Sequence, residues 1–201
     1  MPLYIRERPS AVVLLLSVRR CRILQVSVLL CCLAMTAGAQ PADEYQVKGA
    51  FLFNFAKFVE WPASTFPRAD TPLQICVLGE DPFGPEFEQS ISEKIVQGHR
   101  VEVAHPDGAS HARTCQILFI AGSERRRIPE ILRQLKGTST LTVGDTPAFA
   151  QMGGIINFVL DQNRVRFEIN LEAAELAHLK LSARLLNVAK LVLPGEPTGA
   201  N

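Results

Sequence analysis

The chain has 201 residues, of which 21 are Lys or Arg and 20 are Asp or Glu, so its formal net charge is +1. A nucleic-acid-binding surface needs clustered positive charge, and the three arginines at 125–127 are typical of a solvated helix face instead. These features exclude a nucleic-acid-binding protein, and the length allows one ordinary globular domain.

The first 39 residues predict a secretory signal peptide. Three arginines between positions 19 and 22 precede a 12-residue apolar run at 23–34, and an Ala-x-Ala pattern ends at Ala39. A membrane-spanning helix needs about 20 apolar residues, so we expect cleavage after Ala39 and export to the periplasm. The remaining chain has 16 basic and 19 acidic residues and a net charge of −3. We expect a single domain over residues 40–193 and a disordered tail over 194–201.

Segment 45–60 predicts a largely buried helix. Its apolar residues recur at helical spacing and also occupy most of the helix circumference. Strands and helices then alternate along the chain, which is typical of a mostly parallel sheet covered on both faces. The predicted strands are 73–80, 100–104, 116–122 and 139–145, and the predicted helices are 86–94, 124–136 and 147–152.

The last third of the chain predicts a β-hairpin. Two strands, 155–160 and 164–170, flank a short turn at 161–163. Helical periodicity follows over 171–191, with a break near His178. The expected fold is therefore an α/β three-layer sandwich, with a mostly parallel sheet of five or six strands and an antiparallel hairpin at its C-terminal edge.

Strand 164–170, RVRFEIN, is charged on one face. Val165, Phe167 and Ile169 alternate with Arg164, Arg166, Glu168 and Asn170, so the two sets point to opposite faces of the sheet. A strand of a fully covered sheet is apolar on both faces. The polar face of this strand is therefore either an ordinary solvated edge or a recognition surface for a partner.

Cys76 and Cys115 are the two cysteines after residue 39. They lie in or next to predicted strands, and neighbouring strands bring side chains within bridging distance. An even number of cysteines in an exported chain indicates a disulfide, and two buried free thiols are the alternative. Two cysteines alone do not make a metal site, because the other ligands are missing.

The sequence carries no recognisable catalytic arrangement. It has no glycine-rich dinucleotide turn, P-loop or nucleophile elbow, and its four histidines are scattered without metal-ligand spacing. The order of elements resembles a receiver domain, but the third strand ends in Ile120, Ala121 and Gly122, without a phosphoacceptor Asp. Asp145 follows a strand and precedes Thr146-Pro147, which predicts a turn residue or a helix cap. We therefore expect no enzyme activity, no cofactor and no metal.

Several segments in order resemble the YfiR-like family of periplasmic repressors. They are KGAFLFNFAKFVEWP at 48–62, ICVLGEDPFG at 75–84, CQILFIAG at 115–122, LTVGDTPAFAQMGG at 141–154, and VRFEIN followed by LKLSARLLNVAK. The resemblance spans roughly residues 45–191. It implies a non-catalytic protein that binds and inhibits the periplasmic sensory part of an inner-membrane diguanylate cyclase, which lowers cyclic di-GMP. It also implies sequestration by an outer-membrane lipoprotein and association into a homodimer.

The resemblance also implies roles for particular residues. Cys76 and Cys115 match a family disulfide, whereas further cysteines that some members carry around 150–157 are absent here. Glu168 matches the position expected to contact the partner, with Arg166 and Asn170 beside it on the same strand face. The alternative function is a periplasmic small-molecule-binding protein that presents its ligand to a sensor kinase or receptor, because open α/β sheets bind ligands at the carboxyl ends of their strands.

Overall fold

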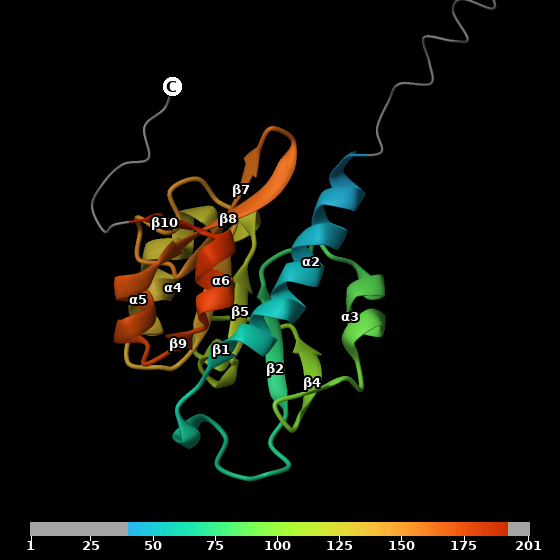
Figure 1. Cartoon of the computed structure of the whole chain (residues 1–201), viewed down its shortest axis with the longest axis vertical. Helices are drawn as coiled ribbons and strands as arrows, with labels where there is room; N and C mark the ends of the chain where they lie inside the picture. The colour runs from blue at the N-terminus through green and yellow to red at the C-terminus, as the bar shows by residue number, and fades with distance from the viewer. Residues whose placement is uncertain (1–39, 193–201) are drawn as a thin grey trace, which may run out of the picture. The chain divides into compact units, whose positions relative to one another are not determined.

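The computed structural model describes residues 40–192, beginning with helix α2 (Gln40–Phe58) (Figure 1). The predicted signal peptide at 1–39 and the predicted tail at 194–201 lie outside the described residues. α2 matches the apolar helix predicted from the sequence, and it ends where Trp61 and Pro62 follow a two-residue strand. None of the helices between residues 40 and 192 combines the length and the apolar character needed to cross a membrane.

The described residues form a mixed α/β fold around one large sheet. Its strand order is β10-β8-β7-β6-β5-β2-β4-β3. The neighbours from β4 to β7 run parallel, the β3–β4 and β7–β8 pairs are antiparallel, and β10 lies parallel to β8. The strands are β2 (Leu73–Leu78), β3 (Ile95–Val96), β4 (His99–Ala104), β5 (Ile117–Ile120), β6 (Leu141–Gly144), β7 (Ile156–Asp161), β8 (Arg164–Asn170) and β10 (Lys190–Val192).

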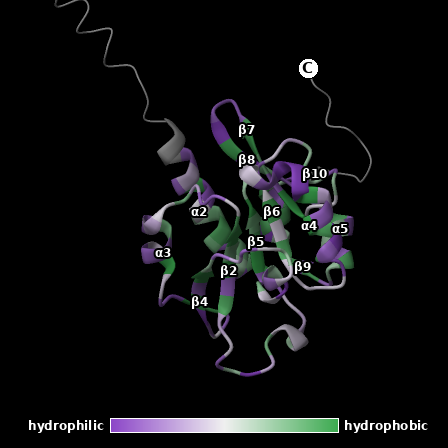
Figure 2. Ribbon diagram, turned by 180° about the vertical axis from the view of Figure 1, so that it is seen from behind, coloured by the Kyte–Doolittle hydropathy of each residue, from purple (hydrophilic) through white to green (hydrophobic). Residues whose placement is uncertain are grey.

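Helices cover both faces of this sheet, as expected for a three-layer sandwich. One core packs α2, α3 (Pro85–Ile91), α5 (Leu171–Leu176) and α6 (Ala183–Val188) against strand residues such as Ile75 and Val77. The other core packs the short helix η3 (His111–Thr114) and α4 (Ile128–Gln134) against Leu78 and Leu118. Figure 2 shows the central strands as hydrophobic and the hairpin tip as hydrophilic. Strands buried on both faces explain why β2 and β5 read as continuous apolar runs.

The C-terminal segment has the predicted break near His178, but it also contains short strands that were not predicted. α5 ends before His178, which adopts a left-handed φ of 57°, and Leu179 is buried. A short strand β9 (Lys180–Leu181) then pairs with β1 (Val59–Glu60), and the Ser182 side chain caps α6. After α6 the chain extends as β10 along the outer edge of β8. The sheet therefore has eight strands instead of five or six, because β3 and β10 are too short for periodicity to reveal.

Two predicted helices also differ in their bounds. Segment 147–152 forms successive turns instead of a helix. The helix predicted at 124–136 starts as a 3-10 helix, η4 (Gly122–Arg127), and becomes α-helical only over Ile128–Gln134. Pro129 stands in the first turn of α4, where its missing N–H donor leaves no hydrogen bond unmade.

Candidate functional site

The β7–β8 hairpin projects beyond the strand on its inner side. β6 ends at Gly144, which pairs with Asn157, whereas β7 continues to Asp161. Within residues 40–192, no strand pairs with the inner edge of β7 at 158–161. Figure 1 shows this hairpin rising above the end of the sheet, with the start of α2 on one side. A pocket of about 380 Å³ lies beside the free edge, and we call it the hairpin pocket.

The hairpin pocket has a polar part and an apolar part. The N-terminal half of α2, the turn after β6 and the hairpin all contribute to its walls. Its polar lining residues are Glu44, Lys48, Asp145, Asn157 and Glu168, and its apolar ones are Pro147, Ala148, Phe158, Val159 and Leu160.

The turn after β6 is held to the sheet by Phe149, which is fully buried. A Cβ atom at Gly154 would lie 2.1 Å from the Phe149 ring, and one at Gly144 would lie 2.7 Å from it. Both glycines are therefore needed to let the ring pack onto the backbone. This packing fixes the turn that carries Asp145 and the apolar wall at Pro147.

Lys48 joins α2 to this turn through a buried ion cluster. Its Nζ lies 2.6 Å from Glu44 Oε1 and 2.7 Å from Asp145 Oδ2. The Tyr45 hydroxyl donates to the same Asp145 oxygen at 2.9 Å, and the Lys48 ammonium lies 4.2 Å from the centroid of the Tyr45 ring. Lys48 is only 5 % exposed, so a buried charge here depends on its two carboxylate partners.

The cluster changes the ionisation of two of its members. Burial alone would lower the pKa of Lys48, but hydrogen bonds to Asp145 and Glu44 outweigh it and raise this pKa above 10.5. Burial and the hydrogen bond to Asp145 raise the pKa of Tyr45 above 10.0. At neutral pH Lys48 is therefore charged and Tyr45 is protonated. Because the Lys48 ammonium already binds two carboxylates, it offers little to an incoming anion.

The structure does not place Arg166, Glu168 and Asn170 in equivalent surroundings. Arg166 is exposed, whereas Glu168 and Asn170 are 3 % and 4 % exposed. Glu168 lines the hairpin pocket and lies 3.4 Å from the Nζ of Lys190 on β10. The Asn170 side chain caps α5 by accepting from the Ala173 N–H at 2.9 Å, and it donates to the Ala150 carbonyl at 2.8 Å. The alternation of apolar and polar residues correctly predicted that these three side chains share one face of β8. Lys190 of β10 lies beside Glu168 and the turn at 146–153 covers Asn170, so Arg166 is the one of the three that stays exposed.

Asn157 is a site residue that the sequence analysis missed. It stands opposite Glu168 in the β7–β8 register and is 2 % exposed. Its Oδ1 is buried without a hydrogen-bond partner, although it lines the hairpin pocket. The available signal was one polar residue inside the apolar run IINFVL. Asp145 directly follows β6, in the turn that was one of its two predicted places, but its carboxylate accepts hydrogen bonds from Lys48 and Tyr45 instead of capping a helix.

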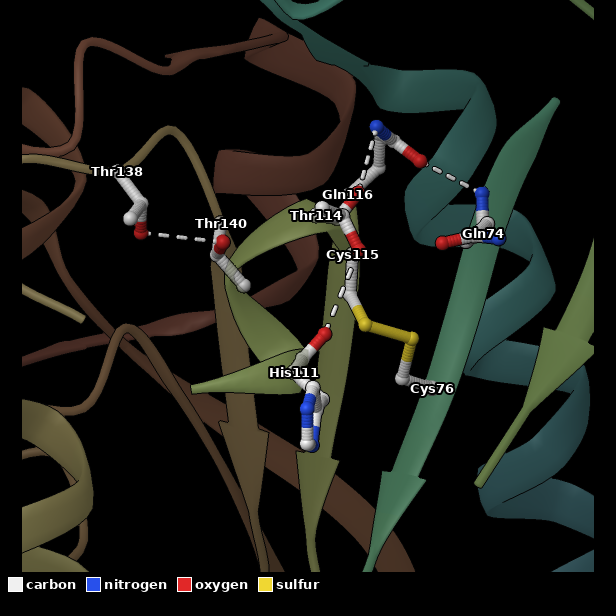
Figure 3. The surroundings of a disulfide bond; sticks show 8 residues. All are labelled: Gln74, Cys76, His111, Thr114, Cys115, Gln116, Thr138 and Thr140. Carbon is white, nitrogen blue, oxygen red and sulfur yellow. Dashed lines mark hydrogen bonds between the residues drawn. A yellow bond between two sulfur atoms is a disulfide. The ribbon is translucent and has the colours of Figure 1, made fainter. Parts of the chain in front are cut away.

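The structure contains the disulfide between Cys76 and Cys115, with Cα atoms 6.0 Å apart. Figure 3 shows it joining β2 to Cys115, which lies two residues before the start of β5. Beside it, the Gln116 side chain accepts from the Gln74 N–H at 2.6 Å and donates to the Thr114 carbonyl at 3.2 Å. Both cysteines are buried, at 0 % and 4 % exposure. The bond therefore fastens the centre of the sheet.

Between residues 40 and 192, no three His, Cys, Asp or Glu side chains gather closely enough to hold a metal ion. The acidic residues at the strand ends have local partners instead. The Asp81 carboxylate accepts from the Phe83 N–H at 2.8 Å, and the Glu80 N–H donates to the Ser123 hydroxyl at 2.9 Å. Ser123 thus fills the space between the ends of β2 and β5. The hairpin pocket, with its unpartnered acceptor, is the stronger candidate for a binding site.

Two of the solved structures that match the chain are partial likenesses. A conserved domain protein from Vibrio cholerae O1 biovar El Tor is 12 % identical, with a TM-score of 0.45 over 59 % of this chain and 54 % of that one. An ABC domain in complex with L-Trp from Streptococcus pneumoniae is 11 % identical, with a TM-score of 0.43 over 59 % of this chain and 55 % of that one. The chain thus spans little more than half the length of either protein, and neither likeness indicates a ligand for it.

No curated protein sequence matches the chain at a significant level. A family profile does match, under the description YfiR/HmsC-like (DUF4154), and it covers residues 45–190. That range includes α2, the disulfide, the hairpin and every residue that lines the hairpin pocket except Glu44. Since the match extends over well more than half of the sequence, the chain belongs to the YfiR/HmsC-like family.

Proposed function

We propose that this protein is a periplasmic regulator that binds the sensory part of an inner-membrane diguanylate cyclase and inhibits it, which lowers cyclic di-GMP. The observation that carries the proposal is the family match over residues 45–190. The signal-peptide pattern at the N-terminus supports export. Sequestration by an outer-membrane lipoprotein and association into a homodimer are further expectations from the family.

We propose the β7–β8 hairpin as the surface that contacts the cyclase. Leu160 is 58 % exposed, and Arg164 and Arg166 are exposed beside it. The inner edge of β7 at 158–161 presents backbone groups that a partner strand can pair with. Arg166 then contacts the partner directly. Glu168 and Asn170 act at the base of the hairpin, Glu168 through the hairpin pocket and Asn170 by holding α5 in place.

The test measures cellular cyclic di-GMP in a deletion strain, complemented with the wild-type gene or with Arg166→Glu. The proposal expects a rise on deletion that the wild type reverses and Arg166→Glu does not. Arg126→Glu makes the same charge change at an exposed residue on η4, far along the chain from the hairpin. This control is expected to complement fully.

A direct binding measurement tests the proposed contact surface on the hairpin independently of the cyclic di-GMP level in the cell. Purified protein is titrated with the purified periplasmic domain of the cyclase, and Arg166→Glu is expected to weaken binding by about tenfold or more, as for a contact worth at least ~1.4 kcal/mol. Its melting temperature should equal that of the wild type, because the side chain is exposed. If Arg166→Glu binds the cyclase domain as tightly as the wild type and Arg126→Glu do, the interface does not lie on the hairpin. Unchanged cyclic di-GMP on deletion would refute regulation of a cyclase.

A further inference from the structure

The hairpin pocket contains a buried acceptor that the fold leaves unused. Asn157 is 2 % exposed, and no residue in the described range 40–192 gives its Oδ1 a hydrogen bond. An unsatisfied buried polar atom costs about 1–3 kcal/mol. An apolar residue would avoid that cost at this position, which lies between Ile156 and Phe158 in an otherwise apolar part of β7. Asn157 also lines the pocket, and a buried acceptor without a partner beside a pocket indicates a ligand that donates a hydrogen bond.

The other unused groups of the pocket are also acceptors. Glu168 lies opposite Asn157 in the strand register. Among residues 40–192 its one ionic neighbour is Lys190 at 3.4 Å, whose side chain is 64 % exposed. The Lys48 ammonium is already bound by Glu44 and Asp145. Three lining carboxylates and one lining ammonium give the pocket a formal charge of −2. A ligand that matches this lining is positively charged and carries several N–H donors.

The remaining walls define the rest of the ligand. Pro147, Ala148 and Val159 are apolar and line the same pocket, and Val159 lies on the same face of β7 as Asn157. The charged group is therefore attached to a hydrocarbon part. The pocket volume of about 380 Å³ lies at the lower end of the range for small-molecule sites. The volume accommodates a compact molecule with one cationic end.

We propose that the hairpin pocket binds a small organic molecule bearing a primary ammonium group. The ammonium donates to Asn157 Oδ1 and to the Glu168 carboxylate, and the hydrocarbon part packs against Pro147, Ala148 and Val159. The ligand lies between α2 and the hairpin and touches both. This proposal does not depend on the identity of the protein partner or on regulation of a cyclase.

The probe is n-pentylammonium, with 1-pentanol and pentanoate as uncharged and oppositely charged analogues. Binding is followed by two-dimensional ¹H–¹⁵N NMR of the purified protein. n-Pentylammonium is expected to shift the Asn157 side-chain amide and the Ala148 backbone amide saturably, and the two analogues are not. Glu168→Gln keeps the shape but removes the charge, and it should weaken binding by about tenfold or more, because a charge-assisted hydrogen bond is lost. Glu172→Gln, an exposed change on α5, should leave binding unaltered.

Asn157→Leu is expected to abolish the saturable shift at Ala148 while the protein keeps its melting temperature. If this variant does not fold, Asn157→Asp replaces it, and the added charge should strengthen binding of n-pentylammonium. The proposal is overturned if no probe gives a saturable shift, if 1-pentanol binds as well as n-pentylammonium, or if Asn157→Leu binds like the wild type. It is also overturned if n-pentylammonium does not bind and Asn157→Leu instead prevents binding of the cyclase domain, since the cation would then be a lysine side chain of the partner. Cyclic di-GMP in the deletion strain is independent of all these outcomes.

Discussion

Asn157 and Asn170 are both buried in the hairpin, but their side chains have opposite hydrogen-bonding states. The Asn170 amide has partners at both ends, at the Ala150 carbonyl and the Ala173 N–H. The Asn157 Oδ1 has none. The local sequence favours a cap at Asn170, which directly precedes the helix LEAAEL, but it does not show that Asn157 lacks a partner. The difference arises from which segment covers each side chain in the folded protein.

This difference predicts opposite effects of one substitution. Asn170→Leu removes the cap of α5 and leaves the Ala150 carbonyl unpaired, so it should lower the free energy of unfolding by about 2–3 kcal/mol. Asn157→Leu removes an unpaired acceptor and replaces it with hydrocarbon, so it should leave the free energy of unfolding unchanged or raise it by up to ~1 kcal/mol. Urea denaturation of the two variants and the wild type makes the comparison. A loss of about 2 kcal/mol or more in the free energy of unfolding of Asn157→Leu, as large as that expected for Asn170→Leu, would mean that Asn157 has a structural partner.

Residue roles were predictable where they depend on residue type and unpredictable where they depend on distant partners. The pairing of Cys76 with Cys115 followed from cysteine count and strand placement. The role of Asp145 did not, because its partner Lys48 is 97 residues away in the sequence. Local turn chemistry favoured a cap at Asp145, and an ion pair with α2 prevailed.

Elements were predictable where they are long and periodic. The apolar helix α2, strands β2, β4, β5 and β6, and the β7–β8 hairpin all lie within or close to their predicted segments. Strands β3 and β10 have two and three residues, too few for a periodic signal. β10 forms because it completes the hydrogen bonding of the outer edge of β8. That interaction exists only after the hairpin and α6 have packed.

The disulfide between Cys76 on β2 and Cys115 before β5 should stabilise the protein mainly by restricting its unfolded chain. It closes a loop with a sequence separation of 39 residues, for which restriction of the unfolded chain predicts about 4 kcal/mol. The double variant Cys76→Ala/Cys115→Ala should therefore unfold at a lower urea concentration than the oxidised wild type. Wild-type protein unfolded and refolded with a reductant should behave like the variant. Identical urea midpoints for oxidised and reduced protein would show that the bond does not stabilise the fold.

At the scale of the whole molecule, alternation of strands and helices predicted the parallel sheet, and both of its helical layers are present. The hairpin pocket was not predictable, because α2, whose Lys48 is 97 residues from Asp145 in the sequence, encloses it together with the turn after β6 and the hairpin. They meet because β6 stops at Gly144 while β7 continues, and because Phe149 packs the turn onto the sheet. The length of one strand relative to its neighbour is set by packing and is not encoded in either strand alone.

The stability of the whole protein should fall in alkaline solution because of the ion cluster that joins α2 to the turn after β6. The pKa values of Lys48 and Tyr45 are raised above 10.5 and 10.0 in the folded state. A group with a raised pKa stabilises the fold fully below its unfolded pKa, and this stabilisation is lost as the pH rises through its folded pKa. The free energy of unfolding should therefore decrease above about pH 10.

Lys48→Met tests this assignment. At neutral pH it leaves the Asp145 carboxylate without its cation, so we expect a loss of about 3 kcal/mol in the free energy of unfolding. The difference from the wild type should begin to narrow above about pH 10.5, and it should narrow further as the pH rises through the raised pKa at which folded Lys48 of the wild type loses its charge. Tyr45 is one of two tyrosines in the chain and the one within residues 40–192, so tyrosinate absorbance of the exported form follows its ionisation directly. A difference in the free energy of unfolding that stays constant up to about pH 12, well above the pKa of roughly 10.4 of a free lysine, would mean that the ion cluster does not govern alkaline unfolding.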